Sequence, residues 1–235
     1  MKPLNGNVAI VTGGSKGIGR AIGRALALEG ATVVLAARSE RDLGRTVEDL
    51  RSEGLAAEGI AADVTSEEQV QRLVDSTIRK YGKVDILVNN AGIGVFKPVG
   101  QLSVAEFDSM WNVNMRGAFL PTTTVLPQMV KQNGGNIVFI SSLAGKNSFK
   151  GGAGYCATKW AMRGFAGSLM LEVREHNIRV CTIFPGSVDT SFSSMNKKGE
   201  HITQPEDVAS AVVFAVTAPG RSMFSEIDVR PTNPH

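Results

Sequence analysis

The chain has 235 residues, 43% of them hydrophobic and 20% charged, with a net charge of +3. This length and composition are typical of one globular domain, and we predict a single domain over residues 1–235. Such a small charge gives no reason to expect a nucleic-acid or membrane partner. The first residues lack the apolar core of a signal peptide, and no apolar run reaches about 18 residues, so we expect a cytoplasmic protein.

Short apolar runs alternate with stretches of helical periodicity along the whole chain. The runs predict strands at residues 8–11, 32–37, 56–61, 84–88, 137–141, 178–183 and 225–229. The periodic stretches predict helices at residues 18–29, 40–53, 67–80, 104–131, 153–176 and 205–216. Strands that are apolar throughout and separated by helices indicate a sheet covered on both faces. We therefore predict the α/β class: a three-layer, doubly wound Rossmann fold with a mostly parallel seven-stranded sheet.

Three residues carry expectations about where helices begin or break. Ser66 offers an N-cap to the helix at residues 67–80, and Pro205 suits the first turn of the last helix. Pro121 lies inside the stretch 104–131, where a missing N–H and a bulky ring disturb helical geometry. We expect it to kink or split that helix.

A glycine-rich segment joins the first predicted strand to the first helix, with the sequence Thr12-Gly13-Gly14-Ser15-Lys16-Gly17-Ile18-Gly19. Glycines let a backbone approach phosphate groups, and the free N–H groups at a helix start bind an anion. The spacing Gly-x-x-x-Gly-x-Gly is a variant of the dinucleotide-binding pattern. Its place between a strand and a helix favours that interpretation over a tight turn without a ligand.

The same segment also matches the Gly-x-Ser-x-Gly elbow of serine hydrolases, with Ser15 as nucleophile. That elbow would stand at the extreme N-terminus, where little oxyanion-hole machinery can precede it. It would also need a catalytic base, and none of the histidines has a supporting motif: His176, His201 and His235. A hydrolase is therefore an alternative that the remaining sequence does not favour.

Two cations near the predicted dinucleotide site indicate which cofactor it takes. An acidic residue about 20 positions after the glycines usually binds a free ribose 2′-hydroxyl, but Ala37 and Arg38 stand there. Lys16 lies in the loop itself. Two cations and no acid suit a 2′-phosphate, so we predict NADP(H) rather than NAD(H). No metal is expected.

Tyr155 and Lys159 form the motif Tyr-x-x-x-Lys, in a chain with only two tyrosines. Four residues are about one helical turn, so the phenol and the ammonium share one face. A cation beside a phenol favours the phenolate and lowers its pKa, which makes a proton donor or acceptor usable near neutral pH.

These motifs together resemble the short-chain dehydrogenase/reductase family over about residues 7–228. The resemblance rests on Thr12–Gly19, Asp63-Val64, Asn89-Asn90-Ala91-Gly92, Asn114, Ser141-Ser142, Tyr155-x-x-x-Lys159 and Pro185-Gly186-Ser187-Val188-Asp189-Thr190. It implies that the cofactor is held by Gly13, Ser15, Lys16, Gly17, Ile18, Gly19, Arg38, Asp63, Val64, Asn90, Ala91, Gly92, Tyr155, Lys159, Pro185, Gly186, Val188 and Thr190. Asp63 would contact the adenine, although an Asp after a strand is also a routine turn residue.

The resemblance also implies four catalytic residues. Tyr155 would exchange a proton with the substrate oxygen, and Lys159 would lower the pKa of Tyr155. Ser142 would orient the carbonyl, and we prefer it to Ser141 because the interval to Tyr155 matches the family. Asn114, in preference to its neighbour Asn112, would hold a water-mediated proton relay.

The implied substrate pocket is mostly apolar and includes Phe96, Ser142, Leu143, Phe149, Tyr155, Phe192 and Met195. The substrate would be a small carbonyl or alcohol compound, and an acyl thioester would also fit. The nearest subgroup is the 3-oxoacyl-carrier-protein reductases, whose docking arginine is replaced here by Leu171 and whose usual Asp-Gly-Gly terminus is absent. Loop lysines could still attract an acidic carrier: Lys146, Lys150, Lys197 and Lys198.

Two further expectations follow. Members of the family usually pair through their two long helices, which predicts a homotetramer or a homodimer built on residues 104–131 and 153–176. The alternative class is a non-catalytic NADP(H)-binding sensor or scaffold. Such proteins typically lose the Tyr or the Lys, and this chain keeps both.

Overall fold

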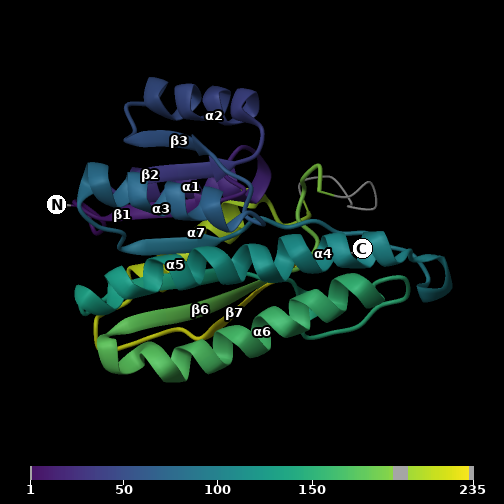
Figure 1. Cartoon of the computed structure of the whole chain (residues 1–235). Coiled ribbons are helices and arrows are strands. Elements are labelled where there is room, and N and C mark those ends of the chain that lie inside the picture. The colour runs from purple at the N-terminus through teal and green to yellow at the C-terminus, as the bar shows by residue number, and fades with distance from the viewer. Residues whose placement is uncertain (1, 193–200, 233–235) are drawn as a thin grey trace.

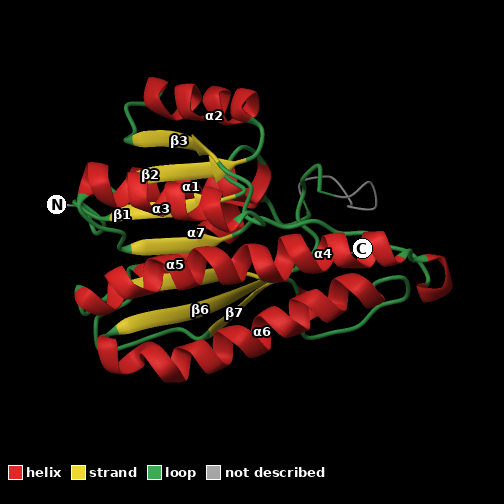
Figure 2. Cartoon of the chain, viewed as in Figure 1, coloured by secondary structure: helices red, strands yellow, loops and turns green. Residues whose placement is uncertain are grey.

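The computed structural model describes residues 2–192 and 201–232. A seven-stranded sheet forms its middle layer, in the order β3-β2-β1-β4-β5-β6-β7 (Figure 2). Every neighbouring pair is parallel, so the predicted sheet is confirmed and is parallel throughout. The strands are β1 (Val8–Thr12), β2 (Thr32–Ala37), β3 (Ala57–Ala61), β4 (Ile86–Asn89), β5 (Gly135–Ile140), β6 (Ile178–Pro185) and β7 (Glu226–Val229).

Helices cover both faces of this sheet and complete the three predicted layers. Side chains of α1, α2 and α7 share one buried cluster with one set of strand residues. Side chains of α3, α5 and α6 share the other cluster with the alternate set. The α-helices are α1 (Gly17–Leu28), α2 (Glu40–Ser52), α3 (Glu67–Tyr81), α4 (Val104–Trp111), α5 (Gly117–Lys131), α6 (Ala153–Val173) and α7 (Pro205–Val216).

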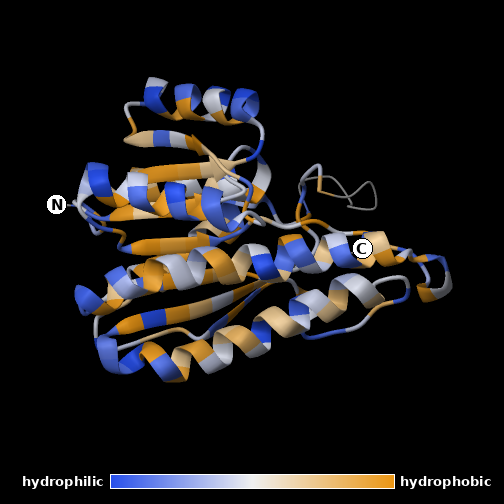
Figure 3. Ribbon diagram, viewed as in Figure 1, coloured by the Kyte–Doolittle hydropathy of each residue, from blue (hydrophilic) through white to orange (hydrophobic). Residues whose placement is uncertain are grey.

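The alternation of the two clusters follows from the pleat of the strands. In β1, Ala9 and Val11 pack on one side while Ile10 packs on the other, and all three are fully buried. Figure 3 accordingly shows the strands mostly in the hydrophobic colours. Such strands, apolar on both sides, are the sequence signal that predicts a buried parallel sheet.

The ends of several elements match their expected caps. The Ser66 hydroxyl accepts the N–H of Gln69 at 3.4 Å, and Gly82 ends α3 in the left-handed region with φ of 81°. Pro205 is the first residue of α7. Among the described residues, no helix combines the length and the apolar character that crossing a membrane requires.

The expectation that Pro121 splits its helix is wrong. Pro121 lies inside α5, which runs unbroken to Lys131. The helical geometry changes one turn earlier, at the π turn Asn112–Arg116 between α4 and α5. Leu120, Pro121 and Val125 are buried, so packing holds the helix through the proline.

The order of the strands places a crevice at one edge of the sheet. From β1 the chain winds outward to β3, then crosses to β4 on the other side of β1 and winds outward again to β7 (Figure 1). The loops after β1 and β4 therefore leave in opposite directions. A doubly wound sheet binds its ligands outside the carboxyl ends of the strands at this switch point.

Candidate active site

A cavity of about 870 Å³ opens at the switch point. Every predicted cofactor and substrate residue that falls in the described part of the chain lines it. Asn114 does not line it. Met195 of the expected pocket, like Lys197 and Lys198, lies outside the described residues. The cavity is also lined by Ala37, Ile93, Gly94, Ser141, Ala144, Ser187 and Ser191, and by residues that the sequence did not single out for this site: Ser39, Asp42, Ala62, Val113 and Ile140.

At two positions the backbone of the glycine loop strongly favours glycine. Gly17 has φ of +53°, and a Cβ at Gly19 would lie 2.2 Å from the carbonyl oxygen of Gly13. The side chain of Lys16, the residue before α1, makes no capping hydrogen bond in the described structure. The N–H groups at the start of α1 therefore face the cavity without a cap from that residue, in the arrangement that binds a phosphate.

Side-chain hydrogen bonds tie the glycine loop to the end of β4. The Thr12 hydroxyl accepts the N–H groups of Asn90 and Ala91 at 3.0 and 3.1 Å. The Asn90 amide in turn donates to the carbonyls of Thr12 and Gly13 at 2.9 and 3.2 Å. The two segments thus form one rigid floor, although they are 78 residues apart in the sequence.

Both predicted cations line the end of the cavity that the sequence predicts for the adenosine, which we call the adenosine end. Lys16 and Arg38 are exposed and line the cavity, beside Ser39 and Asp42 at the start of α2. Asp42 is an acid at this end that the sequence argument did not weigh, because it lies one turn into the helix. The predicted adenine contact Asp63 also lines the cavity, but its carboxylate accepts the N–H and hydroxyl of Thr65 at 2.9 and 2.8 Å. Asp63 therefore acts as a turn residue, which is the second of the two roles that its sequence position allows.

Tyr155 and Lys159 lie in the first turns of α6 and are buried, with 8% and 3% of their surfaces exposed. The Lys159 ammonium is 5.7 Å from the centre of the Tyr155 ring and donates to the carbonyl of Ile140 at 2.9 Å. The shared face predicted for the two side chains is therefore present.

The expected lowering of the Tyr155 pKa is wrong for this structure. Burial raises the pKa of Tyr155 to about 12, and the hydrogen bond with Ser142 only partly opposes it. Burial also lowers the pKa of Lys159 to about 8. The sequence showed the two partners but not how deeply both are buried. At neutral pH the phenol is protonated and can donate its proton.

Ser142 follows β5 and begins the 3₁₀ turn Leu143–Gly145. Its hydroxyl accepts the N–H of Ala144 at 3.1 Å and donates to the carbonyl of Pro185 at 3.4 Å. The competing Ser141 hydroxyl donates to the carbonyl of Lys159 at 3.2 Å. Ser141 therefore braces α6, while Ser142 is the serine that bonds with Tyr155.

Asn114 is fully buried in the π turn between α4 and α5. Its side-chain oxygen accepts the N–H of Ile93 at 2.8 Å, and its amide donates to the Ile93 carbonyl at 3.0 Å and to Thr158 at 2.9 Å. Thr158 donates to the carbonyl of Tyr155 at 2.8 Å. Asn114 thus joins the loop after β4 to the first turn of α6. Its rival Asn112 is exposed.

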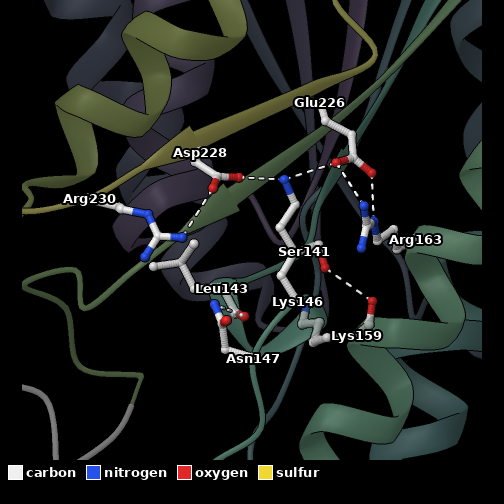
Figure 4. Close-up of polar contacts among 9 residues, drawn as sticks. All are labelled: Ser141, Leu143, Lys146, Asn147, Lys159, Arg163, Glu226, Asp228 and Arg230. Carbon is white, nitrogen blue, oxygen red and sulfur yellow. Dashed lines mark hydrogen bonds and ion pairs between the residues drawn. The ribbon is translucent and has the colours of Figure 1, made fainter.

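The loop lysine Lys146 is not a free surface charge. Its ammonium binds Glu226 at 2.9 Å and Asp228 at 2.6 Å on β7, and it lies 4.1 Å from the centre of the Phe184 ring (Figure 4). Burial opposes the ionisation of Glu226 and Asp228, but hydrogen bonds from Lys146 and from two arginines outweigh it and hold the pKa of each carboxyl below its usual value. Lys146 therefore fastens the loop after Ser142 to the edge of the sheet.

The serine hydrolase alternative finds no geometric support. Ser15 lines the cavity, but His176 lies at the far end of α6, within 3.7 Å of Glu175, and is not among the lining residues. His201 is exposed and does not line the cavity either. His235 lies outside the described residues.

Comparison with known proteins places this site in a family. A family model described as short chain dehydrogenase matches residues 7–201. Sepiapterin reductase of Chlorobaculum tepidum is 34% identical, over 97% of both chains. The chain therefore belongs to the short-chain dehydrogenase family of oxidoreductases, as the motifs predicted.

Two solved structures share the whole fold. A metagenomic short-chain oxidoreductase in complex with NADP is 36% identical, with a TM-score of 0.88 over 98% of this chain and 99% of that one. An actinorhodin polyketide ketoreductase with NADPH is 31% identical, with a TM-score of 0.88 over 96% of each chain. The fold around the cavity is thus the one in which these relatives hold their cofactors.

Proposed function

We propose that this chain reduces a ketone or 3-oxoacyl carbonyl to an alcohol with NADP(H), reversibly, with Tyr155 as the acid and base. The observation that carries the proposal is that Tyr155, Ser142 and Lys159 line one cavity with the glycine loop. The similarity to a sepiapterin reductase and to a polyketide ketoreductase supports it.

The residues at the adenosine end fit NADP(H). The close approach at Gly19 and the start of α1 suit a pyrophosphate, and Lys16 and Arg38 suit a 2′-phosphate. The bound nicotinamide would supply the hydride. We expect kcat/KM to be about tenfold or more higher with NADPH than with NADH. Arg38→Ala should remove most of that difference, while Arg41→Ala, an exposed arginine outside the cavity, should keep it.

The proton that the substrate oxygen needs can come from the protein's own residues. Tyr155, with a pKa of about 12, is a neutral phenol at pH 7 and donates its proton to the substrate oxygen. Ser142, which bonds with Tyr155, has a hydroxyl that can donate to the same oxygen. Lys159, protonated below pH 8, stabilises the negative charge that develops there. Asn114 is a positioning residue that holds the loop and the helix around these groups.

The test is the oxidation of NADPH by the purified chain with a panel of ketones and acetoacetyl thioesters, followed by absorbance. Turnover of a ketone supports a carbonyl reductase, and a clear preference for the thioester supports the 3-oxoacyl assignment. If NADPH binds but no carbonyl is reduced, the reductase proposal fails and the non-catalytic sensor replaces it.

We also propose that the chain forms a homodimer or a homotetramer. Trp111 of α4, Trp160 and Leu171 of α6 are exposed apolar side chains on the two long helical stretches expected to pair. Light scattering coupled to size exclusion would distinguish the two states from a monomer. The cytoplasmic location stays a prediction from the sequence.

A further inference from the structure

Two phenylalanine rings pack against the ring of Tyr155, and a third packs against one of them. The ring of Phe96 meets Tyr155 edge-on, with centres 5.3 Å apart, and the ring of Phe192 lies 6.0 Å from Tyr155 on a tilted plane. Phe149 packs against Phe96 with centres 5.8 Å apart. All four residues line the same cavity. We name the three phenylalanines Phe96, Phe149 and Phe192 the phenyl box.

The phenyl box presents apolar surface that the described residues leave exposed. Phe149 and Phe192 keep 43% and 42% of their surfaces exposed. Gly94 makes room for two of the rings, because a Cβ there would lie 2.7 Å from Phe96 and 3.0 Å from Phe192. Any other residue at Gly94 would displace one or both of these rings. The geometry therefore keeps ring faces and edges at the place where a substrate meets the phenol.

Charges stand away from the phenyl box among the described residues. The other ionisable residues that line the cavity, apart from Tyr155 and Lys159, belong to the loops after β1, β2 and β3 and to the first turn of α2: Lys16, Arg38, Asp63 and Asp42. Lys159 is buried and bonded to a carbonyl. Lys97 pairs with Glu106, Lys146 pairs with β7, and Lys150 does not line the cavity. Among the described residues that line the cavity, a substrate carboxylate would find no free cation beside the phenyl box to replace its water.

We propose that the substrate of this site is a neutral ketone whose carbonyl is carried on a flat ring system, and that the phenyl box selects it. Aromatic side chains stack offset or edge-to-face with a planar ring, and each such contact adds to the burial of apolar surface. A flexible acyl chain gains less from the same rings and loses more rotational freedom when it is fixed. This inference rests on the proposed reductase function and narrows its substrate class.

The experiment compares three ketones of equal carbon number with NADPH: 1-tetralone, its saturated analogue 1-decalone, and 2-decanone. The planar anion benzoylformate is the fourth compound. We expect kcat/KM for 1-tetralone to exceed that of the two saturated ketones by roughly tenfold, although conjugation makes its carbonyl the least reactive. Benzoylformate should be the poorest substrate. Phe149→Leu should reduce the preference for 1-tetralone to about threefold or less. Phe214→Leu, at an exposed phenylalanine outside the cavity, should keep it.

Binding of the same ketones in the presence of NADP⁺, measured by calorimetry, separates this proposal from the reductase function. Equal affinity and equal kcat/KM for the three ketones would overturn the proposed selectivity of the phenyl box and leave the proposed reductase activity intact. Tighter binding of 1-tetralone that Phe149→Leu weakens, without any turnover, would support the box and end the reductase proposal. Failure of 1-tetralone to bind would overturn the box.

Discussion

The two ends of the active-site cavity are built in different ways. At the adenosine end, backbone groups of the glycine loop form the surface, and Thr12 and Asn90 lock that loop to β4. At the catalytic end, side chains from β5, α6 and the intervening loop meet, and most of their contacts span tens of residues. The comparison teaches that a local sequence pattern specifies the backbone of the glycine loop, although its attachment to β4 spans 78 residues, whereas the second end depends on the packing of side chains.

The catalytic end should be the more sensitive to loss of a single atom. Tyr155→Phe removes the proton donor together with its hydrogen bond to Ser142, so we expect kcat to fall by about 10²–10⁴-fold. The adenosine end is untouched, so the affinity for NADPH, measured by fluorescence titration, should change less than about twofold. Tyr81→Phe is a matched control, because Tyr81 is the other tyrosine and its hydroxyl bonds with Glu58 outside the cavity. Full activity in Tyr155→Phe would remove this residue from the mechanism.

At the adenosine end, a large loss of NADPH affinity requires a substitution that moves the backbone. Gly19→Ala places a methyl group 2.2 Å from the Gly13 carbonyl oxygen, so the loop must shift away from the position that suits a pyrophosphate. We expect the affinity for NADPH to fall by about tenfold to a hundredfold, at roughly 1.4 kcal/mol for each tenfold step. Gly44→Ala is the matched control. Gly44 lies in α2 with open space around its Cα, and the change should stabilise the fold by about 1 kcal/mol. Unaltered NADPH binding in Gly19→Ala would contradict the role of the loop.

The structure of the adenosine end could be predicted from the sequence more completely than that of the catalytic end. The glycine loop was predictable because Gly17 and Gly19 are required by backbone geometry within one turn of chain. The seven strands were predictable because burial on both faces requires uninterrupted apolar residues. Pro121 misled, since its effect depends on packing against the sheet rather than on its own φ angle.

The catalytic end shows what sequence could not supply. The spacing of Tyr155 and Lys159 predicted a shared face, but their pKa values depend on burial by segments far away in the chain. Asp42 escaped notice because a helical turn, not a motif, brings it to the cavity. Lys146 was expected only as a loop lysine that could attract an acidic carrier, because its partners, Glu226 and Asp228, lie about 80 residues further on.

Lys159 is expected to lower the free energy of unfolding, because its ammonium is buried at the proposed catalytic site. Its pKa is about 8 in the folded protein, against 10.5 for a fully solvated lysine side chain, so the folded state carries a penalty below pH 8. That penalty is relieved as pH rises from 8 towards 10.5. Lys159→Met should therefore stabilise the protein, and the gain should be about 2 kcal/mol larger at pH 7 than at pH 9.5.

Urea unfolding at the two pH values measures this difference. The raised pKa of Tyr155 contributes stability that is fully present below pH 10 and is lost only as pH rises towards 12, so it does not disturb the comparison. Activity of Lys159→Met should fall at both pH values. A gain in stability that is the same at pH 7 and pH 9.5 would show that Lys159 is not buried as a strained cation.

The smallest effect is expected where the catalytic end is fastened to the edge strand. Lys146→Met removes the cation between Glu226 and Asp228, but each carboxylate keeps an arginine partner, Arg163 or Arg230. The pair lies near the surface, so we expect a loss of about 1 kcal/mol or less in the free energy of unfolding, shrinking further in high salt. Lys150→Met, on the same loop but exposed, should change stability by less than about 0.5 kcal/mol. An unchanged urea midpoint in Lys146→Met would show that the two arginines satisfy the carboxylates alone, and that Lys146 does not hold the catalytic loop in place.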